Sequence, residues 1–172
     1  MKKITTRQLV LCAVLTALAL GLSYLENFLP LTLAIPIPGM KLGLANIVTV
    51  FALYALGPGE ALCILISRCF LGSLFAGNLN ALLFSMLGGL AAMLVMIALN
   101  RLRGLSVYGV SIGGAAAHNC GQVAAAVVSM GNLAPLYYLP ILLGVSLFTG
   151  ALTGFVAGLL FRALQHTNLM KD

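Results

Sequence analysis

Polar side chains interrupt the apolar runs of this chain in two places, and these residues could bind a small molecule. Arg68 lies at the middle of one apolar run, while His118, Asn119 and Gln122 fall within another. On a helix that turns about 100° per residue, the last three occupy an arc of about 100° on one face. Polar groups are costly inside a bilayer unless they face one another or a wet cavity. The arc therefore predicts either a structural polar contact or one wall of a ligand pocket.

Arg68 needs a partner, because an arginine at a membrane helix centre costs roughly 2.5–3.5 kcal/mol on the insertion scale. The predicted membrane and outer half of the chain contain Arg68 and Lys41, but only one acid, Glu26. One cation is therefore left over. Two interpretations follow: an anionic ligand binds Arg68, or Arg68 is a structural clamp on Glu26 and loop carbonyls.

Two further polar residues, Lys41 and Asn46, lie at the start of the second apolar run, after a proline-rich segment at residues 26–40. In a compact bundle they would converge with the others in its outer half, below that segment. The predicted substrate-binding residues are Lys41, Asn46, Arg68, His118, Asn119 and Gln122. One histidine without a nearby acid or paired cysteine falls short of a metal-ligand set, so no metal or cofactor is expected.

The elements that position these residues are predicted to be membrane helices. The chain has nine basic and three acidic residues, 62% hydrophobic residues and a mean hydropathy of +1.12. This composition excludes a water-soluble globule. A span needs about 20 residues, so the chain holds about six. We predict one all-α membrane domain over residues 1–172, with spans at about 8–25, 42–56, 60–76, 81–99, 108–129 and 138–162.

The basic residues predict the orientation of these spans. With the N-terminus inside, only Lys41 falls outside, and the inner segments contain Lys2, Lys3, Arg7, Arg101, Arg103, Arg162 and Lys171. This bias predicts a multi-pass protein of a bacterial cytoplasmic membrane with both termini cytoplasmic. The net charge of +6 is explained by topology, since the basic residues form no continuous patch for nucleic acid.

Small residues recur at every fourth position on three predicted spans, which places each set on one helix face. The three sets are Ala13, Ala17 and Gly21; Gly113, Ala117, Gly121 and Ala125; and Ser146, Gly150, Gly154 and Gly158. On the last two spans the simplest interpretation is packing within the bundle. On the first span, Ala13 and Ala17 could equally face a partner protein.

Several motifs resemble the Gx transporter family, also called heptaprenyl diphosphate synthase component I. They are Pro38 to Asn46, Arg68 with Gly72-Ser73, Leu87-Gly88-Gly89, His118 to Gln122 and Tyr138-Leu139-Pro140, and the resemblance covers about residues 5–164. The chain is also similar to the substrate-binding (S) components of energy-coupling factor (ECF) vitamin transporters. That resemblance implies six helices, an outward-facing pocket covered by the first loop, and docking of a transmembrane T component on an A-x-x-x-A motif. The segment Ala13 to Ala17 matches this motif.

The small number of acidic residues argues against a prenyl diphosphate synthase. Such an enzyme holds Mg²⁺ with aspartate-rich motifs, and this chain has one aspartate, Asp172, and two glutamates. We therefore expect no enzyme, but a substrate-binding subunit for uptake of a small anionic or carbonyl-rich amphipathic metabolite. The chain contains no nucleotide-binding motif, so ATPase subunits would supply the energy. The alternatives are a non-catalytic membrane subunit in polyprenyl diphosphate or quinone metabolism, and an anchor without a pocket.

Overall fold

A computed structural model describes residues 5–28, 41, 43–102 and 104–164, and these residues contain helices and no strand. The proline-rich segment predicted to cover the site falls largely outside them, at residues 29–40. The helices are α1 Thr6–Leu25, the short 3-10 helix η1 Glu26–Phe28, α3 Asn46–Ala55, α4 Pro58–Ala76, α5 Leu79–Asn100, α6 Val107–Met130, the 3-10 helix η2 Ala134–Tyr138 and α7 Leu139–Leu164.

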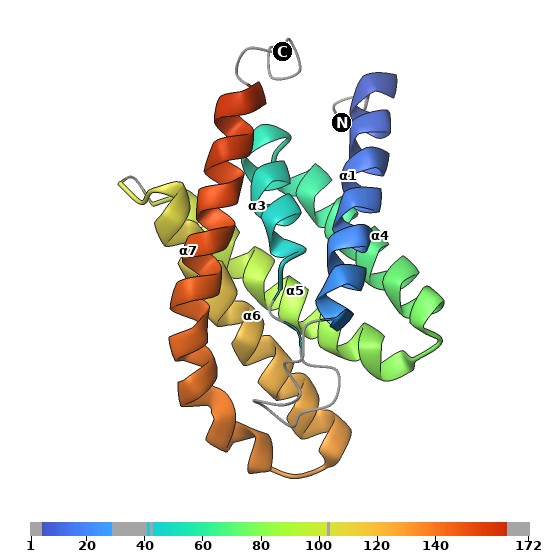
Figure 1. Cartoon of the computed structure of the whole chain (residues 1–172), viewed down its shortest axis with the longest axis vertical. Helices are drawn as coiled ribbons and strands as arrows, with labels where there is room; N and C mark the ends of the chain where they lie inside the picture. The colour runs from blue at the N-terminus through green and yellow to red at the C-terminus, as the bar shows by residue number, and fades with distance from the viewer. Residues whose placement is uncertain (1–4, 29–40, 42, 103, 165–172) are drawn as a thin grey trace.

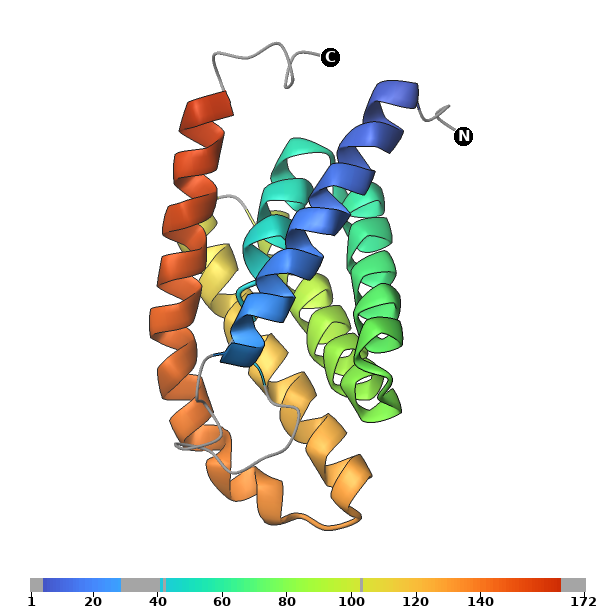
Figure 2. The ribbon, with the colours of Figure 1, turned by 45° about the vertical axis from the view of Figure 1, so that its right-hand side comes forward.

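Successive helices run in opposite directions when the short α3 is included, and the start of α1 and the end of α7 lie at the same end of the bundle (Figures 1 and 2). We call this the terminal end. The ends of α1 and α4 and the starts of α5 and α7 lie at the other end, which we call the distal end. The sequence predicted helices in this order, and the number of membrane crossings and the side of the termini stay predictions.

Within the described residues, four stretches are long and apolar enough to cross a membrane: Thr6–Leu25, Pro58–Ala76, Leu79–Asn100 and Ala134–Ala163. The helix α6 is long enough at 24 residues, but its glycines and polar side chains make it less apolar. It packs between α5 and α7, which explains how a less apolar helix is accommodated. These features support a membrane protein.

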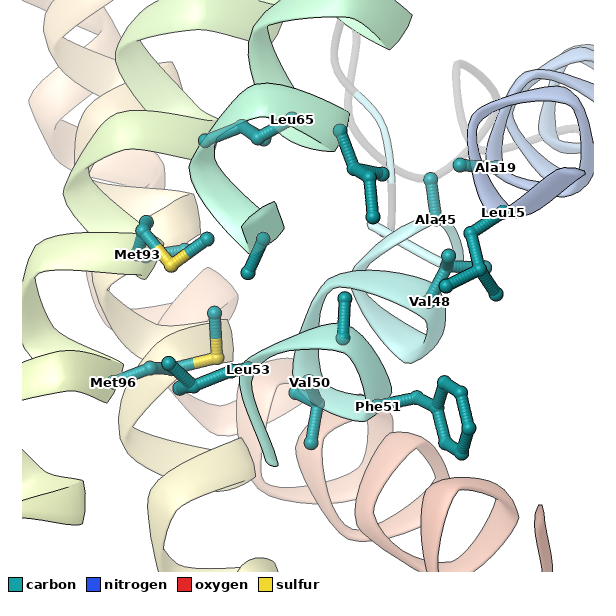
Figure 3. Packing of buried hydrophobic residues seen from close by; sticks show 14 of the residues in the cluster. Leu15, Ala19, Ala45, Val48, Val50, Phe51, Leu53, Leu65, Met93 and Met96 are labelled. Atoms are coloured by element: carbon teal, nitrogen blue, oxygen red, sulfur yellow. The ribbon is translucent and has the colours of Figure 1, made fainter. Parts of the chain in front are cut away.

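The second predicted span differs most from its prediction. Its helix, α3, begins at Asn46 rather than near residue 42 and has 10 residues, a length of about 15 Å, which is half a bilayer core. Residues 46–53 are all buried, and α3 contacts α1, α4, α5 and α7. Figure 3 shows Val48 near Leu15 of α1, while the Phe51 ring lies 5.2 Å from that of Phe161 in α7. Thus α3 is a central packing element rather than a full-length span.

Small residues of α6 and α7 pack inside the bundle, as expected. A Cβ atom added at Gly121 would strike the backbone of Leu87 and Gly88 in α5, and one added at Gly150 would lie 3.0 Å from the Ile112 nitrogen in α6. Close backbone approach of this kind is the usual role of small residues between membrane helices. The α1 stripe differs, because Ala13, Ala17 and Gly21 are all exposed.

Candidate functional site

The centre of the candidate site is a buried contact between α4 and α3. Arg68 is 7% exposed, and its Nη2 donates a hydrogen bond of 3.3 Å to Oδ1 of Asn46, the first residue of α3. Because α3 begins at Asn46, this side chain lies next to Arg68 of α4. The predicted membrane arginine is therefore paired with a neutral amide.

Lys41 connects the segment before α3 with α1 and with α6. Its backbone N–H donates to Gln122 Oε1 of α6 at 3.4 Å, and its Nζ donates to the Oγ and the carbonyl oxygen of Ser23 in α1, at 3.3 and 3.4 Å. Burial lowers the pKa of the Lys41 ammonium, the Glu26 carboxylate opposes that shift, and Arg68 adds to it. Among the described residues, the hydrogen-bond partners of Nζ are neutral, so the ammonium forms no ion pair with them.

His118 lies between two glycines that have no side chain to obstruct it. A Cβ added at Gly88 of α5 would lie 2.9 Å from His118 Cε1 and 3.0 Å from Gln122 Cγ. One added at Gly43 would lie 3.1 Å from His118 Cδ2 and 2.7 Å from Asn46 Nδ2. Gly43 also has a φ of +85°, a conformation that favours glycine. These close approaches bring the imidazole to the same cluster as Asn46 and Gln122.

The structure therefore gathers most of the predicted residues into one group, which we call the polar cluster: Lys41, Asn46, Arg68, His118 and Gln122. Asn119 lies apart from it. Its Nδ2 donates to the Leu142 carbonyl oxygen of α7 at 2.8 Å. Because Asn119 is about 100° further round α6 than His118, it faces α7 and links the two helices.

Glu26 does not bind Arg68. Its Oε1 accepts hydrogen bonds from the backbone N–H groups of Gly43 and of Leu44, the latter at 3.0 Å. Burial raises the pKa of this carboxyl, whereas the two N–H groups lower it, followed by Lys41 and Arg68. Within the described residues, the Arg68–Glu26 ion pair of the clamp interpretation is not formed, since Asn46 is the partner of Arg68. Glu26 instead fixes the backbone that leads into α3.

Among the described residues, three polar atoms of the cluster are buried and have no hydrogen-bond partner: Arg68 Nε and both ring nitrogens of His118. An unsatisfied buried donor or acceptor costs about 1–3 kcal/mol. The cluster therefore has unused capacity to bind a polar or anionic group, with donors on Arg68 and either a donor or an acceptor on His118.

A groove of about 480 Å³ lies between α1 and α4 at the distal end, beside the polar cluster. It is lined by Leu20, Gly21, Ser23, Tyr24, Lys41, Gly72, Phe75 and Ala76. Of the predicted substrate-binding residues, only Lys41 lines it. Sequence reasoning missed Ser23, because its contact with Lys41 joins segments that are 18 residues apart in the chain.

Ala13 and Ala17 lie on the exposed face of α1, where Val10, Val14 and Leu18 are also exposed, at 56%, 58% and 49%. This face is apolar and shaped by small residues, and no other described helix covers it. It is available for contact with lipid or with another membrane helix.

The sequence was compared with known proteins. No curated protein and no solved structure shows a significant match. The model of the family described as heptaprenyl diphosphate synthase component I matches residues 15–160, which run from α1 through α7 and include every predicted substrate-binding residue. This match confirms the resemblance seen in the motifs, and the chain belongs to this family.

Proposed function

We propose that this chain is the substrate-binding membrane subunit of an ECF-type uptake transporter in a bacterial cell membrane. Its substrate would be a small amphipathic metabolite with an anionic or carbonyl-rich group. The observation that carries the proposal is the polar cluster, in which three buried nitrogens of Arg68 and His118 have no hydrogen-bond partner within the described part of the chain. Such convergent polar groups among apolar helices are typical of small-molecule sites.

Charge supports an anionic substrate. The carboxylate of Glu26 is engaged with the backbone N–H groups of Gly43 and Leu44. Glu60 lies in the first turn of α4, about two turns before Arg68, and Asp172 is the last residue of the sequence. Arg68 and Lys41 thus bring two positive charges against one acid, and an anion would balance them.

The exposed stripe on α1 supports a partner helix. Corresponding stripes on α6 and α7 pack inside the bundle, whereas Ala13 and Ala17 remain outside it. We propose that they contact a transmembrane T component. ATPase subunits would drive uptake, since the sequence contains no phosphate-binding G-x-x-x-x-G-K-[ST] motif.

The family description favours a second candidate, a non-catalytic membrane subunit associated with polyprenyl diphosphate or quinone metabolism. In either case we propose that the chain itself is not an enzyme. Binding diphosphate through Mg²⁺ requires several carboxylates, and the sequence has one aspartate and two glutamates.

Mass spectrometry of small molecules that co-purify with the solubilised protein tests the proposal. We expect an anionic amphiphile that is retained by the wild type and lost from Arg68→Gln, together with co-purification of T and ATPase subunits. Retention of a soluble prenyl transferase, without transporter subunits or a bound metabolite, would favour the second candidate.

A further inference from the structure

The groove between α1 and α4 has a chemistry that the polar cluster lacks. Its walls are mainly apolar, and Phe75 and Tyr24 are 78% and 64% exposed at its rim. Both helices are long and apolar enough to cross a membrane, so in a bilayer the groove between them would open toward lipid. At about 480 Å³ the groove is within the usual size of small-molecule sites.

Lys41 connects this groove to the polar cluster. Its Nζ lies at the groove, bonded to Ser23, while its backbone N–H is bonded to Gln122 inside the cluster. In the part of the chain that the structure describes, the hydrogen-bond partners of the ammonium are neutral. An anionic group placed at Lys41 would therefore complement the charge and would lie between the apolar groove and the buried arginine.

We propose that the groove is the subsite for the hydrocarbon part of the ligand, so that the ligand is an anion with a single apolar chain. The chain lies between α1 and α4, and the anionic head group binds Lys41 and extends toward Arg68. Such a ligand can enter sideways from the membrane between the two helices. This inference rests on the proposed function and narrows its substrate class.

Glycines offer a way to fill the groove without disturbing the fold. A Cβ added at Gly72 would make an ordinary contact of 3.5 Å with Leu20 Cδ2, and one added at Gly144 on α7 would meet nothing within 4 Å. Gly72→Leu therefore projects side-chain atoms into the groove, and Gly144→Leu is a matched control elsewhere. Lys41→Met retains side-chain length and removes the charge.

The test uses dodecyl phosphate with a photoreactive diazirine on its chain, added to the full-length protein in phosphatidylcholine nanodiscs. We expect crosslinks on α1 and α4 near residues 20–24 and 72–76.

Gly72→Leu and Lys41→Met should each weaken binding of the probe by about tenfold, whereas Gly144→Leu should not. Dodecanol and inorganic phosphate should compete poorly with the probe. Equal binding by wild type and Gly72→Leu, or equal loss in Gly144→Leu, would overturn the proposal.

Two further measurements separate the groove assignment from binding of bilayer lipid and from the proposed function. Phosphatidylglycerol in the nanodiscs should not displace the probe, and displacement would reassign the groove to bilayer lipid. If Arg68→Gln loses the co-purified metabolite while Gly72→Leu retains it, the groove assignment fails and the proposed function stands. If the probe binds in the groove but no metabolite depends on Arg68, the groove stands and the function fails.

Discussion

At the scale of single residues, the arrangement around Arg68 separates ligand binding from structural support. Arg68 is bonded to Asn46, whereas Glu26 is bonded to the backbone at Gly43 and Leu44. Substitution of Arg68 should therefore mainly affect ligand binding, whereas substitution of Glu26 should mainly affect stability, although the two side chains lie in one region.

Arg68→Gln should weaken binding of the co-purified metabolite by about ten- to a hundredfold, because a buried hydrogen bond to a charged group contributes about 1.5–3 kcal/mol. The melting temperature in detergent should fall only slightly, because the substitution removes one hydrogen bond to a neutral amide. Gln122→Leu should weaken binding less, since it removes a neutral hydrogen bond. Unchanged affinity, with a lower melting temperature in both Arg68→Gln and Glu26→Gln, would restore the clamp interpretation.

Glu26 should make stability depend on pH. Burial raises its pKa above the ordinary value of 4.5, so the folded state binds this proton more tightly than the unfolded state. Its contribution to stability is greatest below pH 4.5 and is lost as the pH rises through the raised pKa. Melting temperatures of wild type and Glu26→Gln, measured from acidic to neutral pH, should differ in slope over this range. If the melting temperatures of the two proteins depend on pH in the same way, the raised pKa of Glu26 is contradicted.

Gly88→Ala tests the fit around His118. The new Cβ would lie 2.9 Å from His118 Cε1, so the imidazole must move. We expect weaker metabolite binding and a loss of stability of about 1–3 kcal/mol from overpacking. Gly144→Ala, at an open position on α7, is the control for helix propensity. Normal binding by Gly88→Ala would remove His118 from the site.

At the scale of helices, the exposed stripe of α1 and the buried stripes of α6 and α7 have the same sequence pattern but different environments. The sequence pattern predicts close packing, but it does not indicate whether the neighbouring helix belongs to the same chain. Only the arrangement of the bundle makes that distinction.

Ala17→Leu should prevent close approach of a partner helix to α1 while leaving the bundle folded. We expect normal metabolite binding, and loss of uptake and of co-purification with T and ATPase subunits. Ala124→Leu, at an exposed position of α6, should retain all three properties. If Ala17→Leu reduces the melting temperature and metabolite binding instead, the α1 stripe is part of the fold.

At the scale of the molecule, the helix order followed directly from long apolar runs separated by glycine, proline and charge. The length of α3 was overestimated, because an apolar run does not show whether it crosses lipid or fills a core. Asn119 was grouped with His118 because adjacent residues share a helix, but they face different neighbours. Gly43, Gly88 and Ser23 act through contacts between distant segments, which the sequence pattern does not encode.

The orientation in the membrane can be measured directly. In a background without the native cysteines, Asn80→Cys and Ser106→Cys place thiols at exposed positions in the distal end and the α5–α6 connection. An impermeant reagent on intact cells should label residue 80 and not residue 106. The opposite result would reverse the topology. Ser106 caps Gly109 N–H, so its replacement should cost about 1 kcal/mol, and a thermal melt checks that the variant is folded.

The short central helix also has a consequence for biosynthesis. A segment recognised as a membrane span has about 20 apolar residues, and α3 has 10. We expect that α3 is not integrated into the membrane alone as it leaves the ribosome. It would be retained as a hairpin with α4, to which it is joined by the tight turn at Gly57. Chains halted before α4 is complete should therefore leave α3 unintegrated, and the polar cluster would form late, after α6 has been made.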